Sequence, residues 1–221
     1  QLTITDPTLV LSKTFDGTTN ANITELGTVT GIVGTDDVTV DAQATYDNAD
    51  VATNKVITVH YTLSGTDAGK YTAPTDYTIT TGIITKSQLY VVGAGITTTK
   101  AYDGTKTAEV YFSGTLNGVA AVDASSISYS ITATYASANA SESAINISVQ
   151  YSFTGVNTNN YILPGNYIVA GHINRKQLTI TDPTITLSKV YDGNNTVAVT
   201  CGTLSGVVSG EDITVAATAV Y

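Results

Sequence analysis

Apolar and polar residues alternate along several stretches of the chain, and the alternating stretches recur. Every second position is apolar over residues 38–46, and the same pattern covers 127–135 and 213–221. A second series covers 57–63 and 147–153. A period of two is the signature of a β-strand with one buried face. These stretches are therefore predicted to be strands.

Turn signals and further strands lie between these stretches. Short glycine-bounded segments, predicted to be tight turns around a short strand, lie at 27–31, 114–118 and 202–206. Polar loops that end in a tyrosine lie at 64–71 and 154–161, and closing strands are predicted at 77–85 and 167–174.

The chain is a repeat array. The opening residues 1–8 return nearly letter for letter at 177–184 and in degraded form at 88–95. We therefore expect three modules, at 1–86, 87–176 and 177–221, of which the last is incomplete. A period this long indicates serial domains, which usually extend, present or tether something.

Composition agrees with an all-β chain. Only 12% of the residues are charged, whereas Thr, Val, Ile and 14 Tyr are abundant, which favours strands over helices. Six or seven short strands per module suit a small β-sandwich of immunoglobulin-like size. The expected fold is an elongated array of tandem immunoglobulin-like sandwiches.

Charge and rare residues exclude several classes of function. The net charge is −9 and only nine Lys and Arg are present, which argues against nucleic acid or an anionic membrane surface as a partner. No apolar run is long enough to span a bilayer, so we expect any signal or anchor to lie outside this segment. The single Cys201 excludes an intrachain disulfide. Two histidines, His60 and His172, supply neither a catalytic triad nor a multi-histidine metal site, and we expect no enzymatic activity.

One motif returns in all three modules, as Lys-x-aromatic-Asp-Gly beginning at Lys13, Lys100 and Lys189. We interpret it as the hairpin that sets the register of each module, with the aromatic filling a core edge, Asp capping the turn and Gly supplying positive φ. An alternative pairs Lys with Asp, as a salt bridge or as half of a Lys–Asn isopeptide crosslink. The crosslink lacks an Asn retained across the modules. The predicted turn residues are Phe15, Asp16, Gly17, Tyr102, Asp103, Gly104, Tyr191, Asp192 and Gly193.

These motifs resemble the YDG repeat family. The resemblance rests on Tyr-Asp-Gly at 102–104 and 191–193, with Phe15 replacing Tyr in the first copy, and on the Gly-Thr-Leu-x-Gly-Val and Ala-Thr-Tyr elements. It implies a β-sandwich stalk or presentation module of a secreted or surface-exposed bacterial adhesin-like protein, and it carries no catalytic residues. Module 2 departs most, with Gly93-Ala94-Gly95 in place of Asp-Pro-Thr.

Two groups of residues are candidates for binding. Carboxylates crowd one part of module 1 and suggest a calcium site, but EF-hand spacing is missing, which favours a solvated acidic loop and no cofactor. These candidate metal ligands are Asp36, Asp37, Asp47 and Asp50. Tyrosines near loops are candidates for stacking on a glycan or a host or matrix protein, against the alternative that they cover the core. They are Tyr71, Tyr77, Tyr161 and Tyr167.

Three functions remain open at this stage. The first is a stalk whose partners are neighbouring repeats of the same polypeptide, on the outside of a bacterial cell. The second is a glycan- or protein-binding module that uses the loop tyrosines. The third is a fibre subunit whose open edge at 213–221 another copy completes by strand addition.

Overall fold

The computed structural model describes all residues from 1 to 221, and the chain is all-β. Two short 3₁₀ turns, η1 (Ala68–Lys70) and η2 (Ala121–Asp123), are its only helical segments. No helix is long and apolar enough to cross a membrane. The contacts divide the chain into two compact units. Unit 1 contains residues 1–94, 114–130 and 151–165, and unit 2 contains residues 95–113, 131–150 and 166–221.

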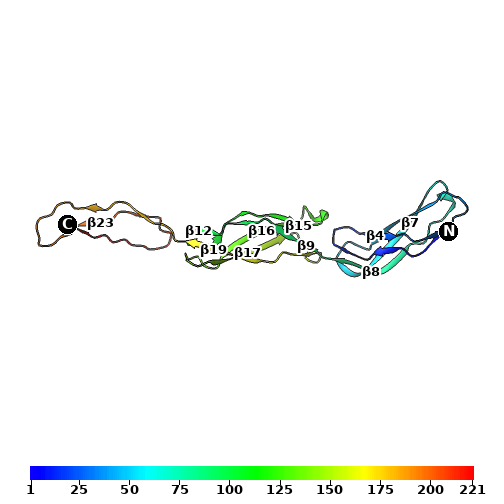
Figure 1. The fold of residues 1–221 in the computed structure, drawn as a ribbon, viewed down its shortest axis with the longest axis horizontal. Helices are drawn as coiled ribbons and strands as arrows, with labels where there is room; N and C mark the ends of the chain where they lie inside the picture. The colour runs from blue at the N-terminus through cyan, green and yellow to red at the C-terminus, as the bar shows by residue number, and fades with distance from the viewer. The chain divides into compact units, whose positions relative to one another are not determined.

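Unit 1 is built on a six-stranded sheet in the order β2-β4-β6-β7-β8-β3. Figure 1 labels its strands β4, β7 and β8 in the blue to cyan part of the ribbon. The bounds are β2 (Thr8–Val10), β4 (Asn20–Glu25), β6 (Thr39–Tyr46), β7 (Ala52–Ser64), β8 (Tyr77–Thr85) and β3 (Ser12–Thr14).

One segment lies at both edges of this sheet. β2 pairs antiparallel with β4, while β3 pairs parallel with β8, and only Leu11 separates β2 from β3. The segment therefore crosses from one edge to the other, and the sheet nearly closes on itself. Closure leaves fewer unpaired backbone groups at the edges.

Short strand pairs extend unit 1. β1 (Thr3–Ile4) pairs antiparallel with β5 (Val29–Thr30). β10 (Tyr90–Val92) pairs in the same way with β15 (Thr115–Asn117), and β9 (Ser87–Gln88) pairs parallel with β18 (Tyr161–Ile162). β5 and β15 are the short strands predicted between glycines. Their partners β1 and β10 lie in the segments that open the first and second repeats, 1–8 and 88–95.

The core of unit 1 follows the period of two. Ile57, Val59 and Tyr61 on β7 are buried, and so are Val40, Ala44 and Tyr46 on β6. Each large apolar side chain buried in this way contributes roughly 1.5–3 kcal/mol. The same cluster includes residues from other parts of the unit, namely Leu2, Phe15, Ile84, Leu89, Ala120 and Tyr161.

A second sheet has the order β12-β19-β17-β16-β13 and lies in unit 2 except for residues 128–130 and 151–154. The bounds are β12 (Thr99–Ala101), β19 (Tyr167–Asn174), β17 (Ile145–Thr154), β16 (Ser128–Tyr135) and β13 (Thr107–Ala108). β12 pairs parallel with β19, as β3 does with β8. β11 (Gly95–Ile96) pairs with β14 (Val110–Phe112), as β2 does with β4. Tyr135, Ile147, Val149 and Ile173 are fully buried there.

The C-terminal part of unit 2 contains three two-stranded sheets. They are β20 (Thr179–Ile180) with β24 (Leu204–Ser205), β21 (Thr184–Ile185) with β23 (Val199–Thr200), and β22 (Thr196–Val197) with β25 (Ala219–Val220). The strand predicted over 213–221 is wrong in extent, because only β25 forms. Its counterparts β6 and β16 each have a second neighbouring strand, β7 and β17, which this part of the chain lacks.

The Asp-Gly motif is not the β-hairpin predicted from the sequence. The strands that flank its first copy, β3 and β4, pair with β8 and with β2 and β6, and never with each other. The motif is instead an arch that joins strands at different places in the sheet. Turn chemistry is local, whereas the partners of the flanking strands are set by the whole fold: Lys13 of β3 pairs with Ile84, and Ala21 of β4 pairs with Ala44.

Candidate functional site

The first copy of the motif is a tight turn held by a lysine. Asp16 Oδ1 accepts hydrogen bonds from Thr18 N at 2.8 Å and Thr18 Oγ1 at 2.9 Å. Lys13 Nζ lies 2.8 Å from the same oxygen and donates to Thr18 O at 2.8 Å. Gly17, between them, has φ +76°, a conformation that favours glycine. We name residues 13–18 the arch turn, and use the same name for 100–105 and 189–194.

The other two arch turns repeat this geometry. Lys100 Nζ lies 2.7 Å from Asp103 Oδ1, and Lys189 Nζ lies 2.8 Å from Asp192 Oδ1. The hydrogen bond from Lys100, followed by that from Thr105 N, lowers the pKa of Asp103 to about 2. The sequence left two interpretations of the aspartate, a cap of the turn or a salt bridge with the lysine. Both are present in the structure, at the same carboxylate oxygen.

Each of the first two lysines also lies over a buried tyrosine. Lys13 Nζ is 5.6 Å from the ring centroid of Tyr46, and Lys100 Nζ is 5.4 Å from that of Tyr135. Cations are attracted to the faces of aromatic rings at such distances. Tyr46 and Tyr135 end the strands β6 and β16, so the lysine ties the arch turn to the body of its sheet.

The aromatic residue of the first arch turn packs against the second repeat. Phe15 is buried, and its ring meets Tyr161 edge to face, with centroids 5.3 Å apart and an interplanar angle of 81°. A Cβ placed on Gly17 would lie 2.4 Å from Cγ2 of Val122. A side chain at Gly17 would therefore crowd the second repeat.

The surface that receives Phe15 is centred on a tyrosine with two partners. The Tyr161 hydroxyl donates to Asp123 Oδ2 at 2.7 Å and accepts from Ala120 N at 3.1 Å. Burial, followed by the bond to Asp123, raises the pKa of Tyr161 to about 12. We name residues 118–123 together with Tyr161 the cap of the second repeat.

The first repeat has an equivalent cap, made of residues 31–36 and Tyr71. The Tyr71 hydroxyl donates to Asp36 Oδ2 at 2.7 Å and accepts from Val33 N at 2.9 Å. Asp36 N donates to Val33 O at 3.1 Å, as Asp123 N donates to Ala120 O at 2.9 Å. The two caps therefore share their backbone turn as well as their tyrosine.

In the third repeat the cap turn covers residues 206–211. Glu211 N donates to Val208 O at 3.1 Å, which places Glu211 where Asp36 and Asp123 stand in the other caps. Its carboxylate accepts a hydrogen bond from the hydroxyl of Tyr102, the aromatic of the second arch turn. A Cβ on Gly104 would lie 3.0 Å from Cγ1 of Val208. Arch turn and following cap thus meet at both junctions between repeats.

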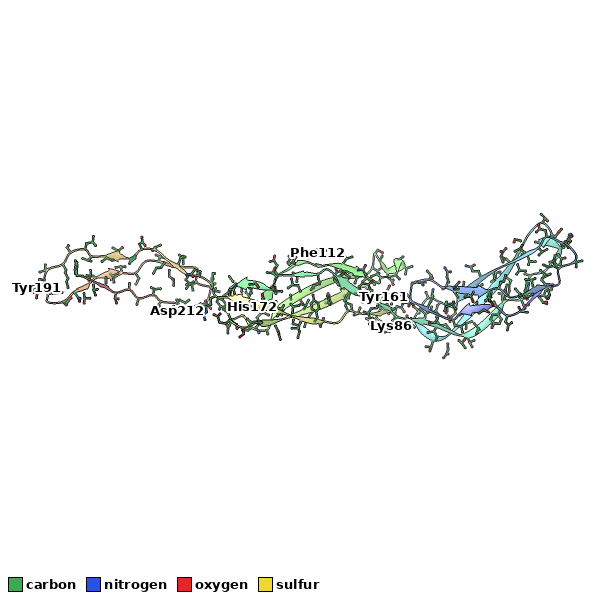
Figure 2. All side chains as sticks on the ribbon, viewed as in Figure 1. Lys86, Phe112, Tyr161, His172, Tyr191 and Asp212 are labelled. Atoms are coloured by element: carbon green, nitrogen blue, oxygen red, sulfur yellow. The ribbon has the colours of Figure 1, made fainter.

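An asparagine adds hydrogen bonds to the first junction. Asn160 is buried; its Oδ1 accepts from Val51 N at 3.1 Å and its Nδ2 donates to Asp50 Oδ1 at 3.3 Å. Lys86 Nζ donates to Thr158 O at 2.7 Å, and Figure 2 shows Lys86 beside Tyr161. Sequence reasoning missed Asn160. The adjacent Asn and Tyr at the end of loop 154–161 were the only sign of it in the sequence.

The third arch turn differs in one respect. Tyr191 is 92% exposed, whereas Phe15 is buried and Tyr102 is half-buried. Figure 2 shows Tyr191 at the tip of its segment. The expectation that the aromatic fills the core edge of its own module therefore fails for Tyr191. The physical reason is that Phe15 and Tyr102 directly follow β3 and β12, which are paired with β8 and β19, whereas residues 186–190, directly before Tyr191, form no paired strand.

The four candidate metal ligands do not gather. Asp36 and Asp37 precede β6, whereas Asp47 and Asp50 follow it, so the length of an eight-residue strand separates the pairs. The first pair has protein partners: Asp36 contacts Tyr71, and Asp37 Oδ2 accepts a hydrogen bond from Thr66 N at 3.0 Å. No group of three or more acidic, histidine or cysteine side chains is placed to hold a metal ion.

Asp47 instead neutralises a lysine that sequence reasoning overlooked. Lys55 is only 4% exposed, and its Nζ lies 3.0 Å from Asp47 Oδ1 and 2.6 Å from Asn48 Oδ1. In the second repeat Ile145 takes the place of Lys55, and Ala136-Ser137 follows the strand where Asp47-Asn48 does in the first. A buried cation requires such partners and a buried Ile does not, so the substitutions are coupled.

The four candidate ligand tyrosines have structural surroundings. Tyr161 and Tyr71 belong to caps, and their hydroxyls are engaged as described. Tyr77 begins β8 and packs against the core of unit 1. Tyr167 begins β19 in unit 2 and is 37% exposed. The structure does not bring the four to one surface.

Histidine and cysteine form no catalytic arrangement. His60 Nδ1 lies 2.9 Å from Asp76 Oδ1 on an exposed face of β7, and His172 is exposed on β19. Cys201 is half-buried and free, with Sγ 3.4 Å from Val215 O.

Comparison with protein families agrees with the repeated geometry. The model of the YDG domain matches residues 1–81, 85–168 and 174–221. The chain belongs to the YDG domain family. Neither the curated proteins nor the solved structures that were searched give a match. The Tyr-Asp-Gly or Phe-Asp-Gly residues of this chain lie in the arch turns, and two of the three arch turns contact the cap of the following repeat.

Proposed function

We propose that this chain is a structural stalk or presentation segment without catalytic activity, in which YDG repeats are coupled end to end. The observation that supports this most directly is the recurrence of the junction: Phe15 with Tyr161, and Tyr102 with Glu211. A junction with an aromatic contact and buried hydrogen bonds resists bending better than a flexible linker does.

The proposal includes a finer description of the fold. Each repeat would be a small immunoglobulin-like sandwich, with modules at 1–86, 87–176 and 177–221, the last incomplete, in an elongated array. The nearly closed sheet of unit 1 and the equivalent strand order in unit 2 support it. The segment that changes edges at Leu11 supplies the two sides of such a sandwich.

We place the stalk on the exterior of a bacterial cell, in a secreted or surface-anchored adhesin-like protein. Only 12% of the residues are charged, the net charge is −9, and the repeats are serial. These features suit a segment that spaces a binding region from the surface. Its partners would be the neighbouring repeats of its own polypeptide, and calcium or another cofactor is not needed for the coupling described.

Small-angle scattering tests the proposal on the wild-type chain and on Phe15→Ala. We expect a monomeric, extended particle whose maximum dimension does not change with concentration, and a broader distribution of dimensions for the variant. Tyr111→Ala, which removes a tyrosine 69% exposed on β14, is the matched control and leaves the distribution unchanged. A compact wild-type particle, or one as flexible as Phe15→Ala, contradicts the stalk.

A glycan array separates the stalk from a binding module. We expect no hit, because the hydroxyls of Tyr71 and Tyr161 are already engaged inside their caps. A hit lost on substitution of Tyr77 or Tyr167 would instead make the chain a binding module.

A further inference from the structure

The first repeat contains a pocket of about 340 Å³ beside β1. Its walls come from two segments, 1–6 and 74–77, and from Tyr61 on β7. All of these residues belong to unit 1. The volume lies at the lower end of the range of pockets that hold small molecules.

One wall of the pocket is a buried tyrosine whose hydroxyl has no partner in the protein. Tyr61 is 2% exposed, and its hydroxyl oxygen forms no hydrogen bond. The other three buried tyrosines, Tyr46, Tyr135 and Tyr161, each donate to a protein oxygen. Nearly all buried polar side-chain atoms have a partner, so an unpaired hydroxyl at a pocket points to a ligand that supplies one.

Two carboxylates give the pocket a negative charge. Asp6 and Asp76 line it, and no lysine or arginine does. His60 Nδ1 lies 2.9 Å from one oxygen of Asp76, but the imidazole is not part of the pocket wall. Burial, followed by the negative charge of Asp6, raises the pKa of Tyr61, so the hydroxyl stays protonated and lies within reach of that charge.

The path of the opener keeps a preceding segment away from this pocket. In the second repeat Ser87, directly before the opener, pairs with Tyr161, the counterpart of Tyr71. The first opener follows the same course, because Leu2 N donates to Thr72 O at 2.9 Å, as the equivalent amide of the second repeat does to Ile162 O. Residues before Gln1 would therefore lie beside Tyr71.

A preceding repeat would leave the pocket open as well. The contacts of the second repeat with the first come from Val122, Thr158, Asn160 and Tyr161. None of them comes from residues 164–167, the counterparts of 74–77. The same junction in front of the first repeat would therefore not cover the pocket.

The charge of this pocket is particular to the first repeat. The strand registers place Gly93 where Asp6 stands and Asn166 where Asp76 stands. Tyr151 takes the place of Tyr61. The second repeat thus keeps the tyrosine and lacks both carboxylates, as expected if the carboxylates serve a ligand of the first repeat alone.

We propose that this pocket binds a primary ammonium group on a short alkyl chain, as carried by a lysine side chain or a small diamine. An ammonium has three N–H donors and no acceptor. The pocket offers three acceptors, the carboxylates of Asp6 and Asp76 and the hydroxyl oxygen of Tyr61. Apolar side chains of the same wall, Leu2, Ile4 and Pro74, suit the alkyl carbons.

A metal ion fits this pocket less well. Calcium takes about six to eight oxygen ligands. No group of three or more acidic, histidine or cysteine side chains is placed to hold a metal ion. The site goes beyond the stalk, which needs no ligand: scattering tests the stalk and ligand binding tests the site, so each proposal can fail alone.

A titration of the full-length ¹⁵N-labelled chain, followed by the amide chemical shifts, tests the site. The probes are 1,4-diaminobutane and Nα-acetyl-lysine amide, at constant ionic strength and about pH 8, where histidine is ordinarily neutral and amines are charged. We expect saturable shifts confined to residues 2–6, 60–62 and 74–77, with a dissociation constant on the order of 1 mM. The tighter probe shows whether a free diamine or a lysine side chain is the better ligand.

Variants test each acceptor. Asp6→Asn and Asp76→Asn should each weaken binding about tenfold, and Tyr61→Phe about threefold. Tyr61→Phe should keep the fold, because its hydroxyl has no protein partner to lose. Glu25→Gln removes an exposed carboxylate on β4, in the same unit but outside the pocket, and should leave the affinity unchanged.

Two further compounds separate charge from hydrogen bonding. 1-Butanol has the alkyl chain without the charge, and tetramethylammonium has the charge without an N–H donor, so neither should shift these amides. Four results would each overturn the proposal. They are equal shifts with 1-butanol or tetramethylammonium, shifts scattered over the chain, no saturation below about 20 mM probe, and equal affinities of Asp6→Asn and Glu25→Gln.

Discussion

Phe15 of the first repeat and Tyr161 of the second meet edge to face, with ring centroids 5.3 Å apart. Tyr161 is held in place by Asp123 and Ala120, so its ring is a fixed platform for Phe15. The residue that begins the YDG motif in this copy is therefore part of a junction, and only its Asp and Gly serve the turn itself.

Phe15→Ala should weaken the first junction by about 3 kcal/mol, because it removes a buried aromatic ring and leaves a cavity beside Tyr161. The measurement is urea-induced unfolding followed by circular dichroism. Tyr111→Ala, at an exposed position on β14, should change the free energy of unfolding by less than about 0.5 kcal/mol. Equal effects of the two variants would show that Phe15 does not support the junction.

Two glycine substitutions separate turn strain from crowding at the junction. Gly17 has φ +76° and Gly193 has φ +83°, so Ala costs about 1 kcal/mol at either residue from backbone strain alone. A Cβ at Gly17 also meets Val122 at 2.4 Å, whereas a Cβ at Gly193 meets nothing within 4 Å. We expect Gly17→Ala to cost about 1–2 kcal/mol more.

Amide hydrogen exchange measures this difference locally. The N–H groups of Thr18 and Asn194 donate to Asp16 and Asp192, so each reports the opening of its own turn. If Gly17→Ala and Gly193→Ala reduce protection equally, Val122 does not press on the first turn.

Much of the fold was readable from the sequence, because strand periodicity is local. The closing strands predicted at 77–85 and 167–174 coincide with β8 and β19, and the pattern over 38–46 became β6. Which strand pairs with which could not be predicted from the sequence. That β3 joins β8 in parallel, and that β3 and β4 avoid each other, follows from contacts distant in sequence.

Only the arch turn of the candidate site could be predicted from the sequence, and its contacts with the next repeat could not. Lys13, Asp16 and Gly17 lie within five residues, and their types indicate a turn. The partner of Phe15 lies in another repeat, and no pattern near residue 15 points to Tyr161. Lys55 was overlooked because a single lysine in a strand pattern reads as an exposed residue, whereas its carboxylate partner Asp47 lies across the β6–β7 connection.

A chelator should leave the stability of the chain unchanged. Asp36 and Asp37 are separated from Asp47 and Asp50 by β6, and their oxygens already have protein partners, so a calcium ion would find no complete set of ligands. Thermal unfolding in EDTA and in millimolar calcium measures this. A melting temperature that rises by several degrees with calcium would restore the metal site.

Lys55 offers a coupled set of variants. Asn48→Ala alone should cost about 1–3 kcal/mol, because it leaves the buried ammonium of Lys55 without one acceptor. Replacing Lys55 by Ile, Asp47 by Ala and Asn48 by Ser copies the second repeat, and should restore the stability to within about 1 kcal/mol of wild type. Urea unfolding gives both values. A triple variant less stable than Asn48→Ala would mean that the lysine contributes more than its partners cost.

Acid should loosen the second arch turn. The pKa of Asp103 is about 2 in the folded chain, below the usual value near 3.9 of an unfolded Asp, so the folded state favours the ionised form. Its contribution to stability is therefore present above about pH 4 and is lost as the pH falls through 2. Other aspartates held by lysines act in the same direction, so wild type must be compared with Asp103→Asn.

The stability of the two proteins should differ at pH 7 and converge towards pH 2, because Asn cannot form the ion pair with Lys100 at any pH. Asp212→Asn, at an exposed position of the third repeat, is the control and should change the free energy of unfolding at pH 7 by less than about 0.5 kcal/mol. Urea unfolding at each pH provides the free energies. A gap between wild type and Asp103→Asn that stays constant from pH 7 to pH 2 would mean that the arch turn does not depend on this charge.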